Sequence, residues 1–196
     1  MLGKISGFFW RIAGWKTFLA GLFIYMFFAT EVMPYGVKMF RLLSRNEKIE
    51  ILDLQFSYSP EKARAIIAEY GDGGRLFAAR FEMTMDTAYP LAYTFLFIIT
   101  IAWIYKALSR YGIVYAYIHL LPLLGMMADY CENICIVTMF KNYPGFSDTV
   151  ARLSSFFTSL KWSLVGVEVL VILVGLGLLV NQRFIRKQNI SGPDVI

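Results

Sequence analysis

Four long apolar stretches constrain this chain more than any other feature of its sequence. They run from Thr17 to Gly36, Ala88 to Leu108, Ile113 to Val137 and Phe156 to Val180. Each has roughly the 20 residues that a helix needs to cross a hydrocarbon core about 30 Å thick. The stretches are continuous rather than alternating in polarity, which favours helices over the strands of a membrane barrel. We therefore predict an all-α integral membrane protein built on a four-transmembrane-helix bundle.

The charge distribution predicts how this bundle is oriented. The chain is 58% hydrophobic and 17% charged, with a net charge of +5. Basic residues outnumber acids before the first stretch, between the second and third, and after the last, which by the positive-inside rule places both termini in the cytoplasm. This topology accounts for the positive charge, so we expect a multi-pass protein of a cytoplasmic (inner) membrane and no nucleic-acid partner. The basic residues of these three segments are Lys4, Arg11, Lys16, Lys106, Arg110, Arg183, Arg186 and Lys187.

Three segments outside the apolar stretches complete the predicted organisation. Residues 1–16 repeat apolar side chains at helical spacing, which indicates an amphipathic helix at the membrane interface. Residues 37–87 form an extracytoplasmic cap and the lead-in to the second span. Residues 181–196 form a basic cytoplasmic tail, whose sequon Asn189-Ile190-Ser191 should then stay unmodified.

Local signals suggest the structure around the cap. Apolar and polar residues alternate from Leu52 to Tyr58, which predicts an extended, half-buried segment. Ser59, Pro60 and Glu61 together indicate a helix start. The glycine-rich run 71–74 should end that helix, with helical structure resuming at Arg75. Pro34 should end or kink the helix of the first stretch.

The strongest candidate site lies inside the third apolar stretch. Asp129, Glu132 and Asn133 are spaced i, i+3 and i+4, so they share one face of a helix. Ionisable side chains at membrane depth are costly and normally face protein or a water-filled cavity. This face therefore predicts a functional site or a buried polar network.

Other acids should reach the same depth from the remaining helices. Asp86 continues inward through Tyr89 and Tyr93 as one polar stripe, while Glu31 and Glu168 occupy the outer halves of the first and fourth stretches. Such acids repel one another unless Arg80 or Lys161 pairs with them, some are protonated, or a cation binds. The candidate binding residues are Asp129, Glu132, Asn133, Asp86, Glu168, Glu31, Tyr89 and Tyr93.

The sequence lacks the motifs of most cofactor-binding sites. Cys131 and Cys135 are spaced i and i+4 on a helix, which indicates buried packing rather than a redox pair. The single histidine, His119, excludes bis-histidine haem within one chain. A nucleophile elbow, a P-loop, a Rossmann fingerprint and zinc spacing are all absent, so we assign no cofactor or metal.

Several short motifs carry a resemblance. The order Tyr58-Ser-Pro-Glu, Gly74-Arg75, Asp86-x-x-x-Pro90-x-x-Tyr93 and Asp129-x-x-Glu132-Asn133 resembles a pattern in small, functionally uncharacterised bacterial four-helix membrane proteins. This resemblance covers half of the chain and implies no activity. The layout of spans, cap and acids is also similar to the EXPERA group, which includes sterol isomerases and sigma-2-receptor-like lipid-binding proteins. The chain departs from those isomerases because no histidine lies near its acids.

Three classes of function fit these observations. The first is a binding protein whose carboxylate-lined pocket takes a lipid, an amine or a cation. The second is an accessory subunit of a larger membrane complex, with membrane lipids and other membrane proteins as partners. The third is an intramembrane, lipid-modifying enzyme that uses Asp129 or Glu132 as acid or base while Asn133 or Tyr93 polarises the substrate. We favour the non-enzymatic roles over catalysis.

Overall fold

The computed structural model of the chain describes residues 2–112 and 117–190, with side chains described as far as residue 185. The predicted start of the third span at Ile113 lies outside the described residues. So do Ser191 of the sequon and the rest of the tail after it, and nothing in the structure bears on the side chains of Arg186 and Lys187.

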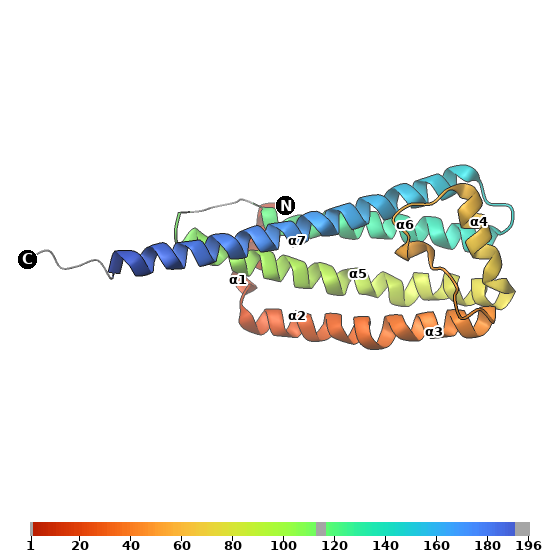
Figure 1. The fold of residues 1–196 in the computed structure, drawn as a ribbon, viewed down its shortest axis with the longest axis horizontal. Coiled ribbons are helices and arrows are strands. Elements are labelled where there is room, and N and C mark those ends of the chain that lie inside the picture. Colours follow the sequence, from red (N-terminus) through yellow and green to blue (C-terminus); the bar gives the residue numbers. More distant parts are fainter. Residues whose placement is uncertain (1, 113–116, 191–196) are drawn as a thin grey trace, which may run out of the picture.

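Long helices lie side by side in one bundle (Figure 1). The first is continuous from Trp15 to Ser44, and the other three are α5 (Gly71–Ser109), α6 (Pro122–Asn142) and α7 (Asp148–Ile190). Four helical segments are long and apolar enough to cross a membrane, and the described residues contain no strand, which confirms the all-α bundle. The helices are longer than the apolar stretches because their polar ends remain helical.

Of the two effects predicted for Pro34, an end of the first helix does not occur. The helix consists of α2 (Trp15–Phe27), the π-helical turn η1 (Phe28–Val32) and α3 (Met33–Ser44). Pro34 lies in the first turn of α3, directly after the wider π-helical turn. The N–H of Met33, directly before the proline, bonds the carbonyl oxygen of Phe28 five residues back. This wider turn accommodates the proline within a continuous helix.

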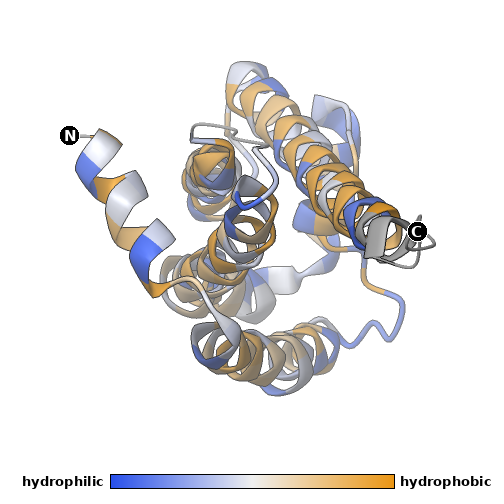
Figure 2. Cartoon of the chain, turned by 90° about the vertical axis from the view of Figure 1, so that its left-hand side faces the viewer, coloured by the Kyte–Doolittle hydropathy of each residue, from blue (hydrophilic) through white to orange (hydrophobic). Residues whose placement is uncertain are grey.

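The amino-terminal helix α1 (Leu2–Ile12) lies at the end of the bundle that faces the viewer in Figure 2. Lys106 of α5 binds the end of α1, with its Nζ 2.9 Å from the carbonyl oxygen of Trp10 and 3.3 Å from that of Ala13. The ring of Trp10 lies 5.6 Å from that of His119 in the short helix η3 (Ile118–Leu120). A cation at the carboxyl end of a helix also stabilises its dipole.

The cap lies at the opposite end, where α4 (Pro60–Glu69) crosses the bundle (Figure 1). The Ser59 hydroxyl accepts a hydrogen bond of 3.2 Å from the backbone N–H of Lys62, as predicted for a helix start. One apolar core joins the cap to the bundle, because Tyr70 at the end of α4 packs between the rings of Phe40 and Phe140. This packing makes the cap part of the fold.

The segment before α4 differs from its predicted alternation. It contains the 3₁₀ turn η2 (Leu52–Leu54), and although Leu52 is buried, Leu54 and Phe56 are 60% and 62% exposed. No strand pairs with this segment; Tyr58 anchors it to α7 instead, through its N–H to the Ser155 hydroxyl (2.9 Å) and its own hydroxyl to that of Ser154 (2.7 Å). Burial raises the pKa of Tyr58 well above its usual range, so this hydroxyl keeps its proton.

The start of α5 also differs from its predicted position. Helix α5 begins at Gly71 instead of Arg75, because the left-handed conformation of Gly71 alone (φ +62°) makes the break after α4.

Two glycines of α7 differ in how closely they pack. At Gly175 a Cβ would lie 2.6 Å from Ile104 Cγ2, whereas one at Gly177 would meet no atom within 4 Å. Close packing against α5 is therefore found at Gly175.

Candidate functional site

A buried lysine on α7 forms the centre of an ionic cluster. The Lys161 Nζ lies 2.6 Å from Glu132 Oε2 and 3.5 Å from Asp129 Oδ1, and it also contacts the carboxylate of Asp53. Glu132 is fully buried, and Asp129 and Lys161 are only 4% and 6% exposed. We call these four residues the Lys161 cluster.

Hydrogen bonds donated from two helices hold the acidic residues of this cluster. The Tyr93 hydroxyl of α5 donates to Asp129 Oδ2 at 2.7 Å. The Thr158 hydroxyl of α7 lies 2.6 Å from Glu132 Oε1. The Trp162 indole N–H, also of α7, donates to the backbone oxygen of Asp53 at 3.2 Å. The cluster therefore joins α5, α6, α7 and the cap at a single point.

The charges of the cluster do not balance. Three carboxyl groups surround one ammonium group, so negative charge is in excess when all four are ionised. One oxygen of each acid lies within 4.8 Å of the others, a spacing that could hold a metal ion. The Lys161 ammonium contacts all three acids, so it already supplies the cation that such a site requires.

A cavity of about 270 Å³ opens beside the cluster. Its polar side is acidic, because the carboxylate of Asp86 joins those of Asp53 and Asp129 there. Aromatic side chains make most of the remaining wall, and Tyr25 stacks on Tyr89 with ring centres 6.0 Å apart. The lining residues are Tyr25, Met33, Asp53, Leu54, Asp86, Tyr89, Tyr93, Phe97, Asp129, Lys161, Trp162 and Val165. We call this space the interior cavity.

The three polar residues predicted to share a face of the third span have different partners. Asp129 and Glu132 face Lys161. Pairing with Lys161 was one of the predicted ways in which the repulsion between these acids could be relieved. Asn133 contacts α5 instead, where its amide N–H donates to the backbone oxygen of Asp86 at 3.2 Å. Asp86, Tyr89 and Tyr93 all line the interior cavity.

Two further candidate residues lie apart from this site. Glu31 is exposed in a surface groove that Arg80 also lines. Glu168 is fully buried, and neither of its carboxylate oxygens has a hydrogen-bond partner. It faces Gly125 of α6, where a Cβ would lie 3.1 Å from its Oε1. The acids of the four helices are therefore distributed over separate places.

Sequence reasoning missed Asp53 as a site residue. Asp53 is 108 positions away from Lys161 in the chain. It belongs to the cap, where an acidic residue does not stand out in the sequence. The one available signal was its place between Leu52 and Leu54 in a segment predicted to be half-buried. Cys131 and Cys135, which were expected to be buried, are half-buried free thiols.

The fold and the site together define a class of protein: an all-α bundle with four helices able to cross a membrane and an acid-rich ionic cluster beneath a cap. No protein-family model, no curated protein and no solved structure matches the chain. The resemblances to the bacterial four-helix proteins and to the EXPERA group therefore stay predictions. Function has to be argued from the site.

Proposed function

We propose that this chain is an integral membrane protein that binds an organic amine in its interior cavity. A single observation carries the proposal: the cavity is lined by three aspartates against one lysine, and aromatic side chains make most of its remaining wall. An ammonium group would balance the excess acid, and aromatic faces attract cations. The role is binding, without catalysis.

The dimensions and chemistry of the cavity favour a small aromatic or aliphatic amine over a bare metal ion. A volume of about 270 Å³ is near the lower end of that of small-molecule sites. Metal ions gain little from tyrosine and tryptophan faces, whereas an organic cation can contact the rings and a carboxylate together. Asp86 is the proposed anchor, because its carboxylate forms no ion pair among the described residues.

The proposal includes an orientation in the membrane. Lys4, Arg11, Lys106, Arg110 and Arg183 belong to segments at the end of the bundle that carries α1 (Figure 1). By the positive-inside rule this end faces the cytoplasm. The cap and the Lys161 cluster then lie toward the outer surface of a cytoplasmic membrane.

Calorimetric titration of the purified protein with phenethylamine tests the proposal. Phenethyl alcohol, which has the same shape without the charge, serves as the matched ligand. We expect the amine to bind, the alcohol to bind at least about tenfold more weakly, and Asp86→Asn to lower amine affinity by about tenfold, because a charged hydrogen bond is lost.

Glu31→Gln is the control variant because Glu31 is an exposed acid outside the cavity. It should bind the amine as the unmodified protein does. Equal affinities for the amine and the alcohol, or an unchanged affinity in Asp86→Asn, would contradict the proposal. Native mass spectrometry of gently extracted protein then identifies the natural ligand by its mass.

A further inference from the structure

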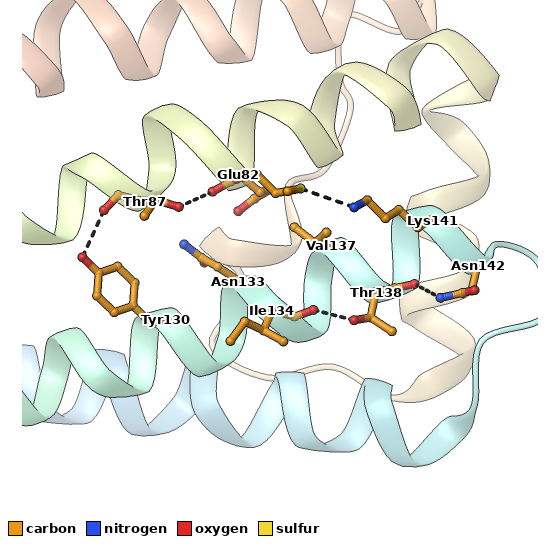
Figure 3. Close-up of a pocket in the computed structure, with 10 residues that line it drawn as sticks. Glu82, Thr87, Tyr130, Asn133, Ile134, Val137, Thr138, Lys141 and Asn142 are labelled. Carbon is orange, nitrogen blue, oxygen red and sulfur yellow. Dashed lines mark hydrogen bonds between the residues drawn. The ribbon is translucent and has the colours of Figure 1, made fainter.

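A second depression, separate from the interior cavity, runs along the surface between α5 and α6 (Figure 3). It has a volume of about 530 Å³ and shares no lining residue with the interior cavity. We call it the α5/α6 groove. Its lining residues are Glu82, Met83, Thr87, Tyr130, Asn133, Ile134, Val137, Thr138, Lys141 and Asn142.

The floor of the α5/α6 groove presents two hydrogen-bond acceptors without donors. Glu82 and Asn133 are each 5% exposed, and neither Glu82 Oε2 nor Asn133 Oδ1 has a partner. The amide N–H of Asn133 is already used by the backbone oxygen of Asp86, which leaves its oxygen as the atom without a partner. Unpaired buried acceptors cost free energy, so a ligand that donates hydrogen bonds here is stabilised.

The floor is also acidic beyond Glu82 itself. Asp86 is one helical turn further along α5, is 3% exposed and interacts electrostatically with Glu82. Two neighbouring buried acids are stabilised by a cation placed against one of them. The donor that fits this floor is therefore positively charged.

The end of the groove nearest the cap carries the opposite charge. Lys141, close to the end of α6, is exposed, and its ammonium lies 3.4 Å from the sulfur of Met83 (Figure 3). It forms no ion pair with any of the described residues. Below it, the exposed apolar side chains of Met83 and Ile134 flank the groove toward the middle of the bundle.

We propose that the α5/α6 groove binds a phospholipid whose headgroup carries both a primary ammonium and a phosphate. The ammonium donates to Glu82 and Asn133, and the phosphate accepts from Lys141. The acyl chains lie along Ile134 and Val137, where the surface is apolar. This site is additional to the proposed amine site, since the two cavities share no lining residue, and Asp86 of the amine site is the neighbour of Glu82 one helical turn away.

The pattern of acceptors decides which headgroup fits. A choline headgroup has the same charges but no N–H group, so it leaves both floor acceptors unpaired. A glycerol headgroup has no cation and places the phosphate charge near Glu82 without compensation. Phosphatidylethanolamine satisfies the floor and Lys141 together.

Competition between lipids, read by native mass spectrometry of the detergent-purified protein, tests this assignment. The probes are phosphatidylethanolamine, its mono- and dimethylated forms, phosphatidylcholine and phosphatidylglycerol, all with identical acyl chains. We expect retention to fall with each N–H group removed, by about tenfold between phosphatidylethanolamine and phosphatidylcholine. Equal retention across the methylation series overturns the proposal, and it does so without any variant that has to fold.

Two variants separate the two ends of the headgroup. Glu82→Gln should abolish the preference for phosphatidylethanolamine over phosphatidylcholine. Lys141→Gln should lower retention of both lipids and keep their ratio, because both carry the phosphate. Glu31→Gln, an acid in a different groove, is the control and should behave as the unmodified protein. If folded Glu82→Gln still prefers phosphatidylethanolamine, Glu82 does not bind the ammonium, and the proposed site is wrong. If Lys141→Gln retains both lipids as well as the unmodified protein does, Lys141 does not bind the phosphate, and the proposed site is wrong as well.

Discussion

At the residue scale, Lys161 carries the electrostatics of the buried site. Its ammonium contacts all three acids of the Lys161 cluster, and none of these acids pairs with another cation among the described residues. Taking charged groups out of water is costly unless they compensate one another. Removing Lys161 therefore leaves several carboxylates uncompensated in a place that excludes water.

We predict that Lys161→Met lowers the free energy of unfolding by about 3–5 kcal/mol, the usual cost of breaking a buried ion pair from one side. Methionine keeps much of the side-chain volume, so the loss reports charge more than packing. Denaturant unfolding in detergent micelles, followed by tryptophan fluorescence, measures the change.

Lys141→Met is the matched control, since Lys141 is exposed and forms no ion pair among the described residues. It should change stability by less than about 0.5 kcal/mol. Adding Glu132→Gln to Lys161→Met should restore part of the loss, because it removes one of the uncompensated acids. Undiminished stability in Lys161→Met alone would show that the acids are already neutral.

The sequence predicted three of the four residues of this cluster, for a clear physical reason. Asp129 and Glu132 stand out because they interrupt an apolar stretch, and Lys161 was a candidate partner for the same reason. Asp53 does not stand out, since its neighbours in the chain are a mixture of polar and apolar residues. Only the long-range contact with Lys161 distinguishes it, and periodicity carries no information about such contacts.

At the scale of elements, α5 and α7 pack closely at Gly175. We predict that Gly175→Ala destabilises the bundle by about 1–3 kcal/mol, because the added methyl group would lie 2.6 Å from Ile104 Cγ2 and force the helices apart. Thermal unfolding of the purified protein, monitored by circular dichroism, gives the difference.

Gly177→Ala provides an unusually close control for this prediction. It lies two residues further along α7, and its new methyl group would meet no atom within 4 Å. Alanine favours a helix over glycine, so Gly177→Ala should leave stability unchanged or raise it slightly. Equal melting temperatures for the two variants would contradict the close packing at Gly175.

Hydrophobicity predicted that these helices exist, but it did not predict the residues at which they begin and end. Apolar stretches locate the parts of a helix that avoid water. Helix α5 begins at Gly71, 17 positions before the apolar stretch that starts at Ala88 and four positions before the predicted helix start at Arg75, because a polar segment remains helical. Pro34 was given too much weight, since its effect depends on the turn that precedes it. The alternation of apolar and polar residues from Leu52 to Tyr58 predicted an extended segment. The chain forms the 3₁₀ turn η2 there instead, and no strand among the described residues lies beside it to pair with.

At the scale of the whole molecule, the two ends of the bundle differ in charge. We predict that a membrane-impermeant maleimide added to intact cells labels Asp72→Cys at the cap end and leaves Arg183→Cys unlabelled. Asp72 is fully exposed and Arg183 is exposed, so burial does not decide the result. Disruption of the membrane should make both positions reactive.

The unsubstituted protein is the control, because Cys131 and Cys135 are free and half-buried and set the background. Labelling of Arg183→Cys but not of Asp72→Cys in intact cells would reverse the orientation. The cap and the Lys161 cluster would then face the cytoplasm. The chemistry of both proposed binding sites would be unchanged, but the sites would lie in the cytoplasmic leaflet.

The contact between Lys161 and Asp53 ties the occupancy of the buried acids to the position of the cap. Asp53 is in the segment that leads into α4, while Asp129 and Glu132 are on α6, so the Lys161 ammonium links the cap to the interior of the bundle. Any cation that binds these carboxylates in place of Lys161 must first weaken this link. By thermodynamic linkage, a ligand that binds the acids in place of Lys161 and the closed cap disfavour each other to the same extent. The cap thus acts as an intramolecular competitor whose strength is set by a single side chain.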